Sequence, residues 1–191
     1  MSRYFIEVAY KGTRYSGFQV QENSNTIQAE VEKAFQIFQR LPVQLTGSSR
    51  TDAGVHAIQN FFHFDFDDEL HAQFIYKMNA ILPKDIVVTN IYTMSSEAHC
   101  RFDAASREYI YRIQKFKNPF FTATALYYPY KLNIASMQEG AEYLLSQTNF
   151  FSFSKTNTQV NNFKCTILKS EWIQNEDELV YKIEANRFLR G

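Results

Sequence analysis

The sequence predicts an α+β fold made of two β-α-β-β-α-β units, the second of them incomplete. Segments with alternating apolar and polar residues, typical of strands, are interleaved with segments whose apolar residues recur at helical spacing. This order of segments occurs over residues 3–92 and begins again after residue 105. Of the 191 residues, 45% are hydrophobic, which is enough for one large or two small cores. The order is that of the ferredoxin-like, or RRM-like, unit with an antiparallel sheet.

The first unit opens with a strand over residues 3–10, in which Tyr4, Ile6, Val8 and Tyr10 alternate with other residues. Turn-forming residues then predict a loop over 11–25, which we call the first loop. The remaining elements are a helix that Asn25 caps and Pro42 ends, strands over 43–47 and 56–66, a helix over 71–82 and a strand over 85–92.

The second unit repeats this pattern only in part. It has a strand over 106–116, a helix over 133–147, and strands over 164–173 and 178–185. A complete unit needs one more helix and strand, of about 12 and 5 residues at average lengths. We therefore expect an N-terminal domain over 1–104 and a second domain over 105–191 that is truncated. The missing helix would leave an apolar sheet face exposed, so we expect the isolated chain to be poorly soluble or to pair with another chain.

Charge gives no global case for a nucleic-acid partner, since 20 basic and 20 acidic side chains cancel. Residues 61–100 hold six acidic and two basic groups, whereas residues 101–191 hold twelve basic and nine acidic groups. An anionic partner should therefore favour the later part of the chain and selected loops. No apolar run of about 20 residues and no signal pattern is present, which predicts a cytoplasmic protein. Cys100 and Cys165 lie in no CxxC motif and are expected to be buried, reduced thiols.

The stretch SSRTDAGVH, residues 48–56, combines turn-forming residues with reactive side chains, and we call it the RTD loop. Asp52 and Gly54 are typical of a turn, and connections between strands are also where catalytic groups concentrate. Arg50 is close enough in a turn to pair with Asp52 and keep it ionised. An ionised carboxylate in a tight loop can stabilise an oxocarbenium-like centre, attack it, or act as a general base.

Two other chemistries of this region are less favoured by the spacing. A metal site would use a carboxylate and imidazoles from Asp52, His56, His63 and His71. His56 and His63 are seven residues apart, so they would face opposite sides of one strand. A Ser-His-Asp triad from Ser48 or Ser49 has no accompanying GxSxG motif.

SSRTDAGVHA resembles the RTD-x-GVHA signature of the tRNA pseudouridine synthase A family. Further blocks resemble that family in the same order: YKGTRYSGFQVQ, TIQAEVEKA, ILPKDI, AHCRFDAASREYIY and ANRFLRG. Ser49 stands where family members usually carry Gly. The family motif also continues past Phe-Leu to an arginine that is expected to pair with the catalytic aspartate, and this chain ends first. That agrees with the expected truncation. The resemblance implies that a chain without this arginine has little activity.

The resemblance implies conversion of uridine to pseudouridine in the tRNA anticodon stem-loop, at about positions 38 to 40, with the base flipped out of the stem. It implies a homodimer and no cofactor or metal. Asp52 would either capture ribose C1′ or remove the 2′ proton. Tyr109 matches the family's active-site tyrosine, although its pattern alone equally fits strand core. Arg50 would fill the space of the flipped base or pair with Asp52.

RNA affinity should come from phosphate contacts by scattered cations, for which the candidates are Lys11, Arg14, Arg101 and Arg107. Tyr15 and Phe18 either stack on nucleotides or anchor the first loop. The alternative function is a non-catalytic protein with tandem RRM-like units. Against it, the sequence contains no run with the K/R-G-F/Y-G/A-F order.

Overall fold

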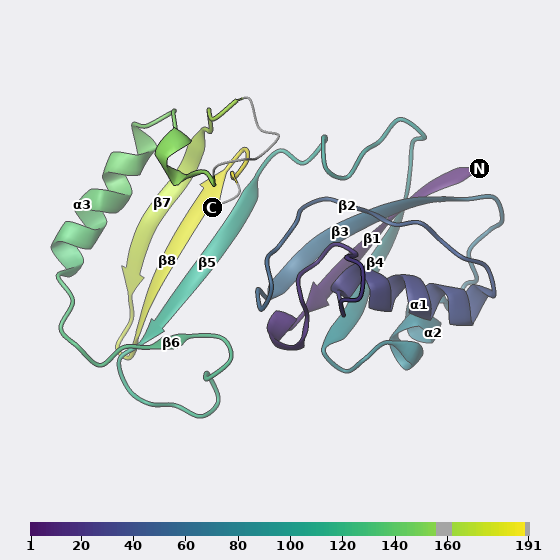
Figure 1. Ribbon diagram of the computed structural model, residues 1–191, viewed down its shortest axis with the longest axis horizontal. Coiled ribbons are helices and arrows are strands. Elements are labelled where there is room, and N and C mark those ends of the chain that lie inside the picture. Colours follow the sequence, from purple (N-terminus) through teal and green to yellow (C-terminus); the bar gives the residue numbers. More distant parts are fainter. Residues whose placement is uncertain (156–161, 190–191) are drawn as a thin grey trace. The chain divides into compact units, whose positions relative to one another are not determined.

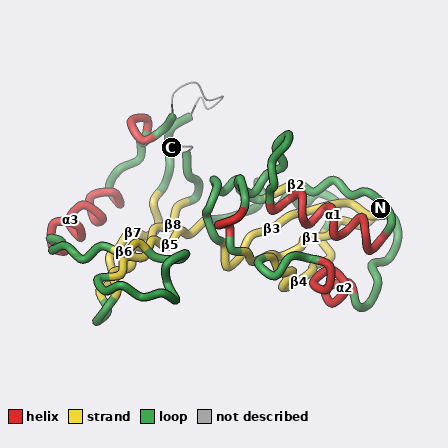
Figure 2. Tube along the Cα trace, turned by 60° about the horizontal axis from the view of Figure 1, so that its bottom comes forward, coloured by secondary structure: helices red, strands yellow, loops and turns green. Residues whose placement is uncertain are grey.

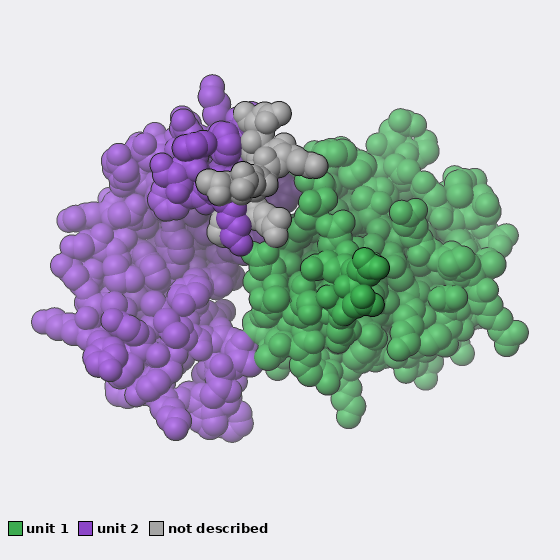
Figure 3. All heavy atoms as spheres, viewed as in Figure 1, with its two compact units in different colours: residues 1–104 green, residues 105–191 purple. Residues whose placement is uncertain are grey.

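The computed structural model describes residues 1–155 and 162–189 (Figure 1). The chain divides into two compact units, residues 1–104 and residues 105–191, which are coloured separately in Figure 3. Each unit contains a four-stranded sheet, and helices occur in both, so the content is mixed α+β. No helix within the described residues is long and apolar enough to cross a membrane.

Unit 1 contains four strands, two α-helices and a short 3-10 helix. In chain order these are β1 (Ser2–Tyr10), η1 (Gly12–Arg14), α1 (Ile27–Gln39), β2 (Thr46–Gly47), β3 (Ala57–Phe66), α2 (Phe74–Ile81) and β4 (Ile86–Met94). The sheet order is β2-β3-β1-β4, and every neighbouring pair is antiparallel. The central strands are β1 and β3. The first loop follows β1 in the chain, and the RTD loop precedes β3.

The core of unit 1 lies between this sheet and the two helices, which Figures 1 and 2 show along the sheet. Ile6 of β1 pairs with Phe62 of β3, and both are fully buried. Phe35 of α1 makes edge-to-face contacts with Phe64 and Phe74, at centroid distances of 5.2 and 5.8 Å. Each such buried aromatic contributes about 1.5 to 3 kcal/mol by removal from water, so this cluster fixes the strands that hold the RTD loop.

The ends of α1 differ from the prediction at the N-cap. Thr26, not Asn25, caps the helix, with its hydroxyl accepting from the amide of Ala29 at 3.3 Å. Arg40 adopts a left-handed conformation at φ 57° and ends the helix two residues before Pro42. Thr26 is fully buried, so a threonine hydroxyl satisfies the orphan amide inside the core.

The strand predicted over 43–47 is only two residues long. Leu45 bonds to α1 and not to β3, since its amide donates to Glu32 Oε1 at 3.0 Å and its carbonyl accepts from Gln28 Nε2 at 2.8 Å. Two side chains of the helix thus take over the backbone groups that a longer strand would have paired.

Unit 2 contains β5 (Arg107–Gln114), β6 (Leu126–Tyr127), α3 (Ile134–Leu145), η2 (Phe151–Phe153), β7 (Ile167–Gln174) and β8 (Glu178–Ala185). The sheet order is β6-β5-β8-β7. The prediction missed β6, and β6 pairs with β5 in parallel, so this sheet is not purely antiparallel as expected. Helix α3 packs along β7, where Gln138 accepts from the amide of Trp172 at 2.9 Å.

Candidate active site

The RTD loop joins β2 to β3 and contains the turn that its composition predicted. The amide of Val55 donates to the carbonyl of Asp52 at 3.3 Å, and Gly54 takes a positive φ of 80°. The base of the loop is closed by the amide of Ser48, which donates to the carbonyl of Phe61 at 2.8 Å. Asp52 therefore lies in the turn with an exposed side chain, between two strands of a packed sheet.

The first loop docks directly against the RTD loop, although the two are about 40 residues apart in sequence. Three hydrogen bonds join them: Phe18 N donates to Thr51 O at 3.1 Å, Gly54 N to Tyr15 O at 3.3 Å, and Gly12 N to His56 Nδ1 at 3.0 Å. Two of these bonds involve only main-chain atoms. The position of Asp52 is thus fixed by the backbone on both sides of its turn.

Glycines make this close docking possible. A Cβ on Gly12 would lie 2.0 Å from the carbonyl oxygen of Val55, a distance that no real contact allows. Gly17 has a φ of +111°, and a Cβ there would lie 3.1 Å from the carbonyl oxygen of Thr51. The glycines of the YKGTRYSGF block are therefore required by the approach of two backbones.

A buried polar network lies beneath the RTD loop. Asn60, which is 6% exposed, donates from Nδ2 to Tyr10 Oη at 3.1 Å and to Ser49 Oγ at 2.9 Å, and it accepts from Ser48 Oγ at 2.7 Å. The hydroxyls of Tyr10 and Thr51 are hydrogen-bonded at 2.8 Å. Sequence reasoning placed Tyr10 only on one face of the first strand and did not consider Asn60. The available signal was the polar Asn60 on the same strand face as Phe62 and Phe64.

Tyr15 and Arg14 attach the first loop to the residue that precedes β4. The hydroxyl of Tyr15 donates to Asp85 Oδ1 at 2.7 Å, and Arg14 Nε donates to Asp85 Oδ2 at 2.8 Å. Burial and the Asp85 carboxylate raise the pKa of Tyr15 to about 12. Burial alone would raise the pKa of Asp85, but the hydrogen bonds from Tyr15 and Arg14 outweigh it and lower that pKa below its usual value.

Phe18 also anchors the first loop. Its ring stacks on Phe62 at a centroid distance of 4.3 Å and an interplanar angle of 8°, and it is 1% exposed. Gly47 leaves the space that this ring occupies, since a Cβ there would lie 2.6 Å from Phe18 Cε1. The burial of Tyr15 and Phe18 favours the loop-anchor alternative over stacking on nucleotides.

Arg50 and Asp52 both have exposed side chains, but the expected charge pair is not found. Among the ion pairs of residues 1–155 and 162–189, none joins Arg50 to Asp52. Arg50 lines a surface groove of about 450 Å³, the Arg50 groove, which Asp52 does not line. The other lining residues are Phe18, Gln19, Val20, Gln28, Glu32, Gln44, Leu45, Thr46, Gly47, Ser49, His99, Arg101 and Phe102.

The segment that carries Arg101 is held against the sheet by a buried pair. The thiol of Cys100 lies 3.1 Å from His63 Nδ1 and 3.2 Å from the carbonyl of Thr46. Burial, with smaller contributions from His99 and Arg3, lowers the pKa of His63, which favours the neutral imidazole. Cys100 and Cys165 are both free and buried, as predicted.

The remaining predicted site residues lie elsewhere. Lys11 is exposed beside η1, and Arg107 of β5 donates from Nη1 to the carbonyl of Asn186 at 3.1 Å. Tyr109 of β5 is half-buried, and its ring meets that of Phe188 edge-on at 4.8 Å. Lys11 belongs to unit 1, like Asp52, whereas Tyr109 and Arg107 belong to unit 2.

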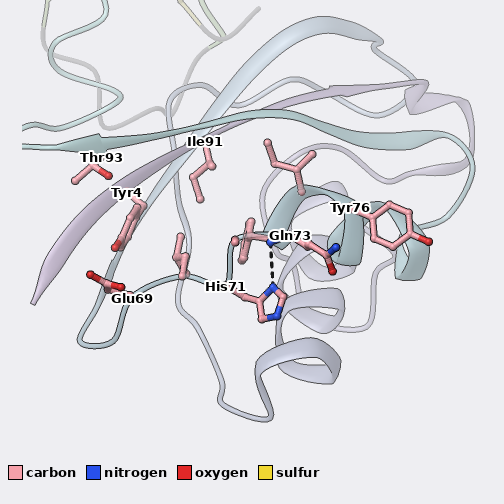
Figure 4. Close-up of a pocket in the computed structure, with 11 residues that line it drawn as sticks. Tyr4, Glu69, His71, Gln73, Tyr76, Ile91 and Thr93 are labelled. Atoms are coloured by element: carbon pink, nitrogen blue, oxygen red, sulfur yellow. Dashed lines mark hydrogen bonds between the residues drawn. The ribbon is translucent and has the colours of Figure 1, made fainter.

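Two further observations bear on the site. A larger hollow of about 740 Å³ lies beside α2, lined by residues that include Tyr4, His71 and Tyr76 (Figure 4). None of the residues predicted for catalysis or RNA binding lines it. Within the part of the chain that the structure describes, no group of three or more His, Cys, Asp or Glu side chains is placed to hold a metal ion.

Comparison with known proteins places these features in a family. The family model described as tRNA pseudouridine synthase matches residues 6–103, which include the first loop, the RTD loop and the Cys100 segment. Proteins named tRNA pseudouridine synthase A from Parabacteroides distasonis and Porphyromonas gingivalis are each 40% identical over the whole chain, which covers 77% and 78% of their lengths. One from Staphylococcus aureus is 35% identical over 98% of the chain and 72% of its own length. With its docked loops and turn-borne aspartate, this chain belongs to the tRNA pseudouridine synthase family.

Proposed function

We propose that this protein isomerises uridine to pseudouridine in tRNA, at the anticodon stem-loop, with Asp52 as the catalytic residue. The observation that carries the proposal is the exposed Asp52 carboxylate in a turn whose backbone is clamped from both sides. A group held in this way keeps its geometry while an RNA base is brought to it, and such fixed orientation lowers the barrier of the reaction. The relatives named tRNA pseudouridine synthase A support the substrate and the reaction.

The proposed reaction leaves the atomic composition of the nucleotide unchanged. The bond from N1 to C1′ breaks, a bond from C5 to C1′ forms, the C5 proton leaves to solvent and N1 gains a proton. Asp52 either attacks C1′, forming an ester that C5 then displaces, or removes the 2′ proton and returns it once C5 has bonded to C1′. Both routes need an ionised carboxylate. We assign Tyr109 to stacking on the uracil and to proton transfer at C5, and Arg50 to the space that the flipped base vacates.

The phosphate contacts are assigned to Lys11, Arg101 and Arg107. Arg14 remains a candidate as well, because its side chain is 68% exposed despite the bond to Asp85. Cations of this kind position the RNA backbone without reading its sequence. Tyr15 and Phe18 are assigned to holding the first loop, because their rings are buried.

We further propose that units 1 and 2 are two domains of ferredoxin-like arrangement and that the protein acts as a cytoplasmic homodimer. The order β-α-β-β-α-β of unit 1, with strands ordered β2-β3-β1-β4, supports the arrangement for the first domain. The RTD loop belongs to that domain, whereas Tyr109 belongs to the second.

Substitution of Asp52 by Asn tests the assignment, because it keeps the shape of the side chain and removes its charge. We expect the variant to release tritium from tRNA labelled at uridine C5 at least about 100-fold more slowly, with little change in its affinity for tRNA. Asp68→Asn, at another exposed carboxylate of unit 1, is the matched control and should remain active. An Asp52→Asn variant as active as the unmodified protein would contradict the assignment. Tight tRNA binding without tritium release by a protein of the full length of these relatives, of which this chain spans 77% and 78%, would instead favour the non-catalytic RNA-binding alternative.

A further inference from the structure

The Arg50 groove lies next to the proposed catalytic turn but is not explained by the isomerisation of the target uridine. Its volume of about 450 Å³ falls within the range of about 300 to 1,000 Å³ that small-ligand sites occupy. It lies within unit 1, between the end of the first loop, the first turns of α1, the residues around β2 and the segment 99–102. Arg50 is the only residue of the proposed catalytic set in its wall.

The charges in the wall suit an anion on one side of the groove. Arg50 and Arg101 are the two guanidinium groups, and His99 lies on the same segment as Arg101. The one carboxylate is Glu32, whose Oε1 accepts hydrogen bonds from Gln28 Nε2 at 2.8 Å and from the amide of Leu45 at 3.0 Å. Glu32 is thus engaged in holding the chain before β2, so a phosphate would bind on the arginine side.

Phe102 provides an aromatic surface beside those arginines. Phe102 is 75% exposed, so a face of its ring is open to a ligand. The ring of His99 lies 4.2 Å from it, and the guanidinium carbon of Arg101 lies 5.9 Å from its centroid. Exposed aromatic rings next to arginines are the usual platform for unstacked bases in RNA-binding proteins.

This platform is held in place by its own segment. The amide of His99 donates to Asp103 Oδ2 at 2.7 Å, and the amide of Arg101 donates to His99 Nδ1 at 3.2 Å. Cys100, between them, is fixed to His63 and Thr46. The groove is therefore largely formed before any ligand binds, which lowers the entropic cost of binding.

We propose that the Arg50 groove binds an unpaired nucleotide of the RNA substrate that is not the target uridine. Its base stacks on Phe102, and its phosphate contacts Arg101. This inference rests on the proposed function, since it takes the RNA to be the tRNA whose uridine reacts at Asp52. It adds a second holding point for the strand from which the target base has been flipped.

Binding of a fluorescently labelled anticodon stem-loop RNA to the protein tests the stacking. Phe102→Leu keeps an apolar side chain but removes the ring, and we expect it to raise the dissociation constant about 5- to 100-fold. Phe102→Tyr keeps the ring and should bind like the unmodified protein. Phe120→Leu, at a phenylalanine 89% exposed in unit 2, is the matched control and should also be unchanged. Equal affinity of Phe102→Leu and the unmodified protein would overturn the proposal.

Photo-crosslinking locates the nucleotide independently of any effect on affinity. With 4-thiouridine placed beside the target position, we expect crosslinks to map to residues 99–102. Crosslinks confined to other peptides would overturn the proposal even if Phe102→Leu bound weakly. Neither measurement needs turnover, so both are separable from the tritium assay. If tritium release is normal and the groove variants bind RNA with unchanged affinity, only the proposal for the groove is contradicted. If crosslinks map to the groove but no tritium is released, only the proposed isomerisation is contradicted.

Discussion

At the scale of single residues, the site depends on groups that carry no chemistry themselves. Asn60 and Tyr10 satisfy the hydroxyls of Ser49 and Thr51, the residues on either side of Arg50. A buried polar network of this kind is costly when one member is lost, since its partners stay buried without a hydrogen bond. We expect the loss of a network member to change activity by displacing the turn, and not by removing a contact with RNA.

Gly12 offers the sharpest test of the loop docking. We expect Gly12→Ala to destabilise the protein by about 1 to 3 kcal/mol and to lower activity, because the new methyl group would overlap the carbonyl of Val55 and force the two loops apart. Denaturant unfolding measures the first effect, and tritium release measures the second.

Gly140→Ala is the matched control for this prediction. It makes the same change within α3, where a Cβ would meet nothing within 4 Å. Alanine is favoured over glycine inside a helix by up to about 1 kcal/mol, so this variant should be as stable as the unmodified protein or slightly more stable. A Gly12→Ala protein with unchanged stability and activity would show that the loops tolerate separation.

Residue-level prediction from the sequence succeeded where the chemistry is local. Asp52 and Gly54 were predicted to form a turn because turn preferences depend on the residues of the turn itself. The pairing of Tyr10 with Asn60 was not predicted, because it joins positions 50 residues apart through a strand register. The Arg50–Asp52 pair was predicted from sequence distance alone, and the structure directs Arg50 into a groove wall instead.

At the scale of elements, long periodic segments were predicted well and short ones were not. The strand at 178–185 has the predicted bounds. The observed bounds of β1 lie within one residue of the predicted strand over 3–10, and α1 lies between its predicted limits, Asn25 and Pro42. The two-residue strand β6 was missed because two residues contain no periodicity to detect. The docking of the first loop was also beyond prediction, since two of its three hydrogen bonds join main-chain groups, which do not depend on residue type.

The attachment of the first loop to Asp85 predicts a characteristic alkaline unfolding. Because the pKa of Tyr15 is raised in the folded protein, the fold favours the protonated phenol. Its contribution to stability is therefore complete below the unfolded pKa near 10 and is lost as pH rises toward about 12. We expect the free energy of unfolding to fall between pH 10 and about 12 more steeply for the unmodified protein than for Tyr15→Phe.

Chemical denaturation at a series of pH values measures this difference. Tyr76→Phe is the control, at a tyrosine 69% exposed on α2. It should follow the unmodified protein across the whole range. Parallel curves for Tyr15→Phe and the unmodified protein above pH 10 would mean that the Tyr15 hydroxyl does not anchor the loop.

At the scale of the whole molecule, the hydrophobic core cluster found among the described residues belongs entirely to unit 1. All of its buried members, from Ile6 to Val88, and all the hydrophobic side chains packed against it, from Tyr4 to Ile91, lie within residues 1–104. A core of this kind is sufficient for independent folding at a length of about 100 residues. The residues proposed for catalysis, in contrast, come from both units, since Asp52 is in unit 1 and Tyr109 in unit 2.

Expression of residues 1–104 alone separates folding from function. We expect this fragment to unfold in a single cooperative transition, because its core needs no residue of unit 2. We also expect it to release no tritium from uridine-labelled tRNA, because the fragment lacks the tyrosine assigned to the base and to proton transfer at C5.

The full chain carrying Tyr109→Phe is the comparison, since it keeps both units and removes only the hydroxyl. A fragment without a cooperative transition would show that unit 2 completes the fold of unit 1. A folded fragment that isomerises uridine would show that the chemistry resides in unit 1 and would remove Tyr109 from the catalytic assignment.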